Sequence, residues 1–86
     1  MNLKGANPAS ASRLEYSLPT AAHVNLSIFD VQGRNVRTLI DQDAAAGSFT
    51  ARWDGTTETG LQAKKGVYFA RLNAGGKSTE KKVVLQ

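Results

Sequence analysis

Residues 48–72 read SFTARWDGTTETGLQAKKGVYFARL, and this stretch decides the fold. Phe49, Ala51 and Trp53 alternate with polar residues, which is the two-residue period of a half-buried strand. Residues 67–72 form a second run that is rich in β-branched and aromatic side chains, a composition typical of strands. The stretch therefore predicts two β-strands joined by a long turn.

Small and polar residues mark the turn between these two strands. Asp54-Gly55 ends the first strand, because glycine accepts the positive φ of a tight turn and aspartate can bond its own nearby backbone. Gly60 and Gly66 punctuate the rest of the loop. We expect Asp54 to cap the turn through backbone N–H groups.

Trp53 is the only tryptophan of the chain. One indole buries about 200 Å², so we place Trp53 at the centre of the core. We also expect Tyr68 to contribute to the structural core around Trp53. Neighbouring residues of a strand face opposite sides, however, so either Tyr68 or Phe69 is expected near the surface.

Four further runs predict the strands that surround this pair. They cover residues 13–18, 22–29, 34–40 and 77–85. In the third run the apolar alternation slips between Val36 and Leu39, which indicates a bulge or an edge strand. Arg34 and Arg37 would help protect such an edge against aggregation.

Turn signals separate these runs. Asp30-Val31-Gln32-Gly33 places Gly33 where a positive φ is needed, and Gly75-Gly76 is a favoured two-residue hairpin turn. Residues 41–47 are polar and small and predict a connection, in which residues 44–46 could form one helical turn.

Length and composition fix the class of protein. The 86 residues suffice for one domain, which we divide into a linker over residues 1–12 and a domain over 13–86. The absence of cysteine excludes disulfides and thiolate metal sites. Short strands with regular turn signals predict an all-β fold, a small antiparallel immunoglobulin-like β-sandwich of six or seven strands.

The net charge of +4 lies in the second half of the chain. Residues 1–43 sum to zero, whereas residues 44–86 hold seven basic and three acidic side chains. Such asymmetry indicates either a solvated basic surface or a face for an acidic partner. A nucleic-acid partner is not expected, since no aromatic residue is interleaved on residues 77–86 and no recognition helix exists. No apolar run approaches the ~20 residues of a membrane span.

Three residue groups invite a chemical interpretation, and each has a structural alternative. His23, the only histidine, could serve a Ser-His-Asp arrangement or lie on a strand surface. Asp54 and Glu58 could bind Ca²⁺, but two carboxylates fall short of its six to eight oxygens. An aromatic set could stack on a sugar or pack in the core, and it comprises Tyr16, Trp53, Tyr68 and Phe69. We favour the structural alternative each time, and expect no catalytic, cofactor-binding or metal-binding residue.

A family resemblance rests on residues that occur in order from Asn7 to Gln86. They are Asn7-Pro8, Tyr16–Pro19, Ile28–Arg34, Ala46-Gly47, Trp53–Gly55, Gly60, Gly66–Leu72 and Lys81–Leu85. In this order and spacing the chain resembles the type A C-terminal sorting domains of the type IX secretion system. It equally resembles the immunoglobulin-like domain of the flagellar hook-capping protein. Lys64-Lys65 depart from the family pattern, which usually has small or apolar residues there.

The resemblance implies a non-catalytic secretion, sorting and cell-surface attachment domain at the C-terminus of a larger secreted protein. Its route would cross the periplasm of a Gram-negative bacterium. Its partners would be a secretion-machinery protein at the outer membrane and an upstream cargo domain on the same chain. We expect the last strand to present the recognition residues, namely Lys77, Lys81, Lys82, Val83, Val84 and Leu85. A structural or assembly module like the hook-capping domain and a carbohydrate-binding accessory domain are the alternatives, and the oligomeric state stays open.

Overall fold

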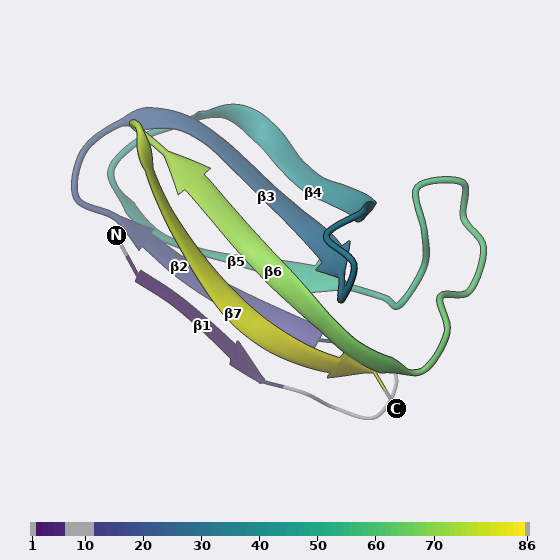
Figure 1. The fold of residues 1–86 in the computed structure, drawn as a ribbon. Coiled ribbons are helices and arrows are strands. Elements are labelled where there is room, and N and C mark those ends of the chain that lie inside the picture. Colours follow the sequence, from purple (N-terminus) through teal and green to yellow (C-terminus); the bar gives the residue numbers. More distant parts are fainter. Residues whose placement is uncertain (1, 7–11, 86) are drawn as a thin grey trace.

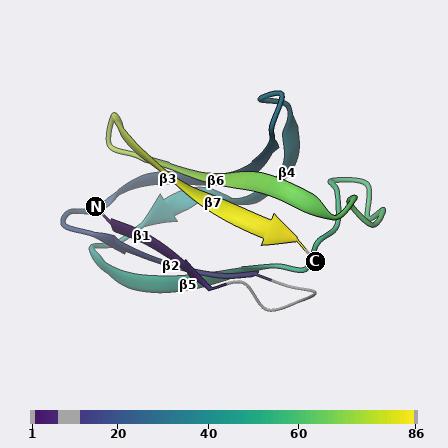
Figure 2. The same cartoon turned by 60° about the horizontal axis from the view of Figure 1, so that its bottom comes forward.

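The computed structural model describes residues 2–6 and 12–85, which form two facing antiparallel β-sheets (Figures 1 and 2). Within these ranges the strands are β1 (Asn2–Ala6), β2 (Ser12–Leu18), β3 (Ala22–Asp30), β4 (Asn35–Ala44), β5 (Gly47–Trp53), β6 (Gly66–Ala74) and β7 (Lys77–Leu85). One sheet has the order β1-β2-β5 and the other β4-β3-β6-β7. The predicted antiparallel β-sandwich is confirmed. The described residues include no helix long and apolar enough to cross a membrane.

Trp53 lies at the centre of the core, with no exposed surface. Its indole meets the ring of Tyr68 edge to face, with 5.0 Å between the ring centroids and an interplanar angle of 67°. The indole Nε1–H donates to the carbonyl oxygen of Thr56 at 2.8 Å, so its only polar group is satisfied. Tyr68 is buried and Phe69 is half-buried, as the strand alternation predicts.

The two short turns form as their residues predict. Gly33 has a φ of +82°. Asp30 Oδ1 accepts from the backbone N–H groups of Gln32 and Arg34, at 2.9 Å each. The Arg34 N–H contributes most to holding the pKa of the Asp30 carboxyl below its ordinary value. Gly75 and Gly76 both have positive φ and join β6 to β7.

Strand β4 is an edge strand with two register shifts against β3. Leu39 and Val36 are the residues that the shifts skip, which confirms the predicted irregularity. The connection expected over residues 41–47 is mostly wrong, because β4 continues to Ala44 and pairs with residues 22–25 of β3. The helical turn considered at 44–46 is also absent, because Ala44 is the last residue of β4 and residues 45–46 lead through a bend into β5.

The linker expected over residues 1–12 contains strand β1. Its five residues pair with β2 in an antiparallel register that places Leu3 opposite Tyr16. Leu3 is buried in the core, and its apolar side chain accounts for the docking of this segment. Asn7-Pro8, Met1 and Gln86 lie outside the described residues.

Candidate functional site

The loop between β5 and β6 folds back onto the edge of β4. The Glu58 N–H donates to the carbonyl of Val36 at 3.0 Å, and the Glu58 carboxylate accepts from the N–H of Thr38 at 2.8 Å. Arg37 Nη1 donates to the Thr56 hydroxyl and, at 3.3 Å, to the carbonyl of Thr57. The loop therefore satisfies backbone groups that the bulges of β4 would leave unpaired.

The two carboxylates weighed as calcium ligands both have partners within the protein. Asp54 Oδ1 accepts from the Thr56 hydroxyl at 2.6 Å and from the Thr56 N–H at 3.1 Å. The hydroxyl contributes most to lowering the pKa of Asp54. Asp54 thus caps its turn, as the sequence predicts, while Glu58 binds the β4 edge. The described ranges hold no group of three His, Asp or Glu side chains that could bind a metal ion.

His23 lies on the exposed face of the β3–β4 ladder between two aspartates. Its Nε2 is 2.6 Å from Asp41 Oδ1, and its Nδ1 is 2.8 Å from Asp43 Oδ1. These hydrogen bonds, that to Asp41 first, raise the pKa of His23 above its ordinary value. With both ring nitrogens on carboxylates, neither is free to take a proton from a nucleophile. The geometry gives His23 a cross-strand structural role.

The aromatic set weighed as a sugar platform lies mostly inside the molecule. Tyr16, Trp53 and Tyr68 are buried. Tyr16 stacks on Phe49 with 5.3 Å between ring centroids. Only Phe69 of the set has a partly exposed ring. A flat stacking surface made of these four rings is therefore not present.

The recognition residues predicted on β7 divide between its two faces. Val83 and Leu85 pair with Tyr68 and Gly66 and point into the core, where both are buried. The strand alternation makes them core residues, so in the folded domain these two side chains offer almost no surface to a partner. The members that solvent can reach are the exposed Lys77, Lys81 and Lys82 and the half-buried Val84.

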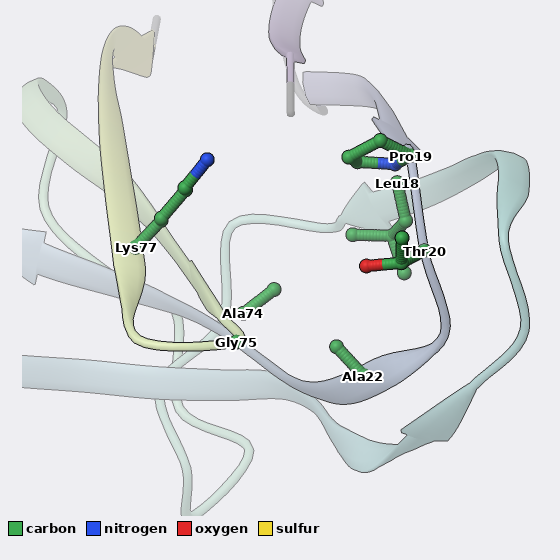
Figure 3. Close-up of a pocket in the computed structure, with 7 residues that line it drawn as sticks. All are labelled: Leu18, Pro19, Thr20, Ala22, Ala74, Gly75 and Lys77. Carbon is green, nitrogen blue, oxygen red and sulfur yellow. The ribbon is translucent and has the colours of Figure 1, made fainter.

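A small pocket lies at the end of the sandwich where the β2–β3 connection approaches the β6–β7 hairpin (Figure 3). Leu18, Pro19 and Thr20 form one wall, and Ala74, Gly75 and Lys77 lie across from them. Its volume of about 70 Å³ is far below the roughly 300–1,000 Å³ of ligand pockets. Among the described residues, the exposed surface is therefore a better candidate for recognition than this hollow.

All seven acidic side chains have intramolecular partners. Glu15 pairs with Arg13, Asp30 with Arg34, Asp41 and Asp43 with His23, Asp54 with Thr56 and Arg37, Glu58 with Thr38, and Glu80 with Arg71. Five lysines, in contrast, have no ion pair with any described residue: Lys64, Lys65, Lys77, Lys81 and Lys82. Arg52 on β5 also has no ion pair among the described residues. The other unmatched positive charges in this part of the chain lie on β7 and in the loop before β6, a signal already present in the charge asymmetry of the sequence.

Comparisons with known proteins agree with this architecture. FlgD from P. aeruginosa has a similar structure, with a TM-score of 0.66 and 22% identity over 95% of this chain and 64% of FlgD. Dimeric latent PorU from Porphyromonas gingivalis gives a TM-score of 0.65 and 22% identity over 98% of this chain and 9% of PorU. The chain thus spans less than two thirds of the length of either protein. No curated protein matches it.

The sequence model of the FlgD Ig-like domain family matches residues 2–78. This match covers strands β1 to β6 and the first residues of β7. The chain belongs to the FlgD Ig-like domain family.

Proposed function

We propose that this chain is a non-catalytic sorting and surface-attachment module of a larger secreted bacterial protein. A secretion-machinery protein at the outer membrane recognises it, and it delivers the cargo domain that precedes it on the same chain. The route passes through the periplasm of a Gram-negative bacterium. The residue pattern that resembles type IX sorting domains supports this role, and so does the structural likeness to a part of PorU.

The observation that carries the proposal is the separation of charge on the surface. Every acidic side chain has a partner within the fold, whereas the lysines of β7 are exposed and have no ion pair with any described residue. A surface of this kind attracts an acidic protein partner and accelerates its association. Recognition of a folded surface therefore suits this molecule better than chemistry at a pocket.

A secretion assay tests the proposal. The chain is fused behind a reporter that carries its own periplasmic leader, and the fusion is expressed in a host with the type IX system and in a mutant host without it. We expect reporter in the medium or on the cell surface only in the intact host. Retention of the fusion in the periplasm of both hosts would contradict the proposal.

A role as a structural module in assembly is the second candidate, and the family match favours it. Here the domain would hold neighbouring subunits together rather than direct export. In a flagellated host, deletion of the domain from its parent protein would then impair hook assembly and leave export of the parent intact. Loss of export with normal hooks would favour the sorting role.

The carbohydrate-binding alternative has lost most of its structural basis, since three of its four rings are buried. Phe69 is the remaining test position. A pull-down with insoluble polysaccharide checks this role, and binding that Phe69→Ala abolishes would restore it.

A further inference from the structure

Among the described residues, no other strand or loop lies over the outer face of the β4-β3-β6-β7 sheet (Figures 1 and 2). The residues of this face include an apolar group. The strand register places Phe29 of β3 opposite Phe69 of β6, and Val67 of β6 opposite Val84 of β7. Val67 is 39% exposed, and the other three side chains are half-buried. These four residues, here called the outer-face patch, form a continuous surface across three strands.

Two cations border the outer-face patch, and one is fixed in place. Arg71 lies 4.6 Å above the centre of the Phe29 ring, and its Nε and Nη2 both lie 2.9 Å from Glu80 Oε2. Lys82 is paired in register with Phe69, and it has no ion pair among residues 12–85. The border thus combines a guanidinium held by its neighbours with an ammonium group that is free to bind.

The charge of this face selects the kind of partner. The acidic side chains of this chain already have partners, so a second copy would have to break its own ion pairs or hydrogen bonds to approach Lys82. Stacking of successive nucleic-acid bases needs several free aromatic faces, but Arg71 covers Phe29, which leaves Phe69 as the single partly exposed ring of the patch. A protein surface with carboxylates around an apolar anchor would match both the patch and its border.

We propose that the outer-face patch and Lys82 form the docking site for an acidic protein segment with one apolar anchor residue. The anchor contacts Val67, Phe69 and Val84, and a flanking carboxylate pairs with Lys82. This inference rests on the proposed sorting function and specifies its partner by chemical class. It places recognition on the outer side of β7, away from Val83 and Leu85.

An NMR titration of the 86-residue chain tests the docking site. The probe is a synthetic peptide with one phenylalanine between two pairs of glutamates. Two control peptides are matched to it: one has glutamine in place of each glutamate, and the other has alanine in place of the phenylalanine. We expect the first peptide alone to shift the signals of Val67, Phe69, Lys82 and Val84. Shifts confined to other residues, or equal shifts with the glutamine peptide, would overturn the proposal.

Charge reversal on one strand supplies the matched control. Lys82→Glu replaces one attraction by a repulsion, which we expect to weaken peptide binding about three- to tenfold. Lys77→Glu makes the same change on the other face of β7 and should leave binding within about twofold, because its charge is screened at that distance. Equal weakening by both variants would show only a general charge effect and would overturn the site.

Single-stranded DNA and anionic vesicles are the competing probes. Displacement of the acidic peptide from the outer-face patch by either one, with tighter binding, would overturn the choice of a protein partner. The Lys82→Glu fusion in the secretion assay separates the two proposals. If the wild-type fusion and the Lys82→Glu fusion are both exported normally, the docking site is contradicted and the sorting function stands. If the wild-type fusion is not exported, the sorting function itself is contradicted.

Discussion

Replacing Gly55 with alanine tests how the loop after β5 closes over the end of the last strand. Gly55 has a φ of +83°, and a Cβ built there would lie 3.1 Å from both Gln62 Nε2 and Leu85 Cδ1. Gly60 provides a matched control, because its φ is +87° and nothing lies within 4 Å of its added Cβ. The left-handed conformation costs a non-glycine residue about 1–2 kcal/mol at either position. Crowding against buried Leu85 should add about 1–3 kcal/mol at Gly55 alone.

Urea denaturation followed by Trp53 fluorescence measures the two variants, since the indole is buried beside this loop. We expect Gly55→Ala to lower the free energy of unfolding by about 2–5 kcal/mol and Gly60→Ala by about 1–2 kcal/mol. The melting temperatures should then differ by at least about 4 °C for a domain of this size. Effects of alanine on the unfolded chain are common to both variants and cancel in the comparison. Equal losses at the two positions would refute the packing of Gly55 against Leu85.

Three other predictions concern β3, β4 and β7. Because the folded-state pKa of His23 is raised, its two hydrogen bonds should stabilise the protein fully below about pH 6.5. That stabilisation should be lost as the pH rises through the folded-state pKa. The measurement is the difference in urea midpoint between wild type and His23→Gln from pH 5 to about 9. A difference that stays constant over this range would contradict the prediction. Glu58→Ala removes the acceptor for the Thr38 N–H and should lower the free energy of unfolding by about 1 kcal/mol. Hydrogen exchange at the Thr38 amide should accelerate, and unchanged protection would refute the contact. Leu85→Ala removes a buried side chain and should lower the free energy of unfolding by about 2–5 kcal/mol. Lys81→Ala changes an exposed side chain and should alter this free energy by no more than about 0.5 kcal/mol. Similar denaturation midpoints for the two variants would contradict the core role of Leu85.

The local features of this fold were predictable from the sequence. The alternation around Trp53 determines which side of β5 faces the core, and it requires no knowledge of the other strands. Gly33 and the Gly75-Gly76 pair define turns because few other residues adopt their positive φ. Asp54 reaches its donor two residues along the chain, a local contact that residue type alone indicates.

Features that depend on distant residues were not predictable in this way. Strand β1 is mostly polar and small, and it is a strand because β2 offers it an edge and the core takes up Leu3. Glu58 is 20 residues from Thr38 in sequence, so no local pattern shows that it covers the β4 edge. Val83 and Leu85 stand beside lysines on a charged strand, which suggested a recognition tail. Their pairing with Tyr68 and Gly66 buries them instead.

The same pairing determines how a recognition surface on β7 must be tested. Deletion of residues 81–86 removes Val83 and Leu85 from the core together with the lysines, so loss of export would reflect unfolding as readily as lost recognition. Substitutions of exposed charges avoid this ambiguity. They leave the core residues in place and change only the electrostatic potential of the face.

Export of a reporter fused to charge-reversed variants is the most direct measurement of recognition through the lysines of β7. One variant carries Lys77→Glu, Lys81→Glu and Lys82→Glu, and its control carries Arg52→Glu, Lys64→Glu and Lys65→Glu, with the same change in net charge. Both variants should remain folded, which the fluorescence of Trp53 can verify. Accumulation of the β7 variant in the periplasm beside normal export of the control is the predicted result, and export of the β7 variant at the wild-type level would contradict it.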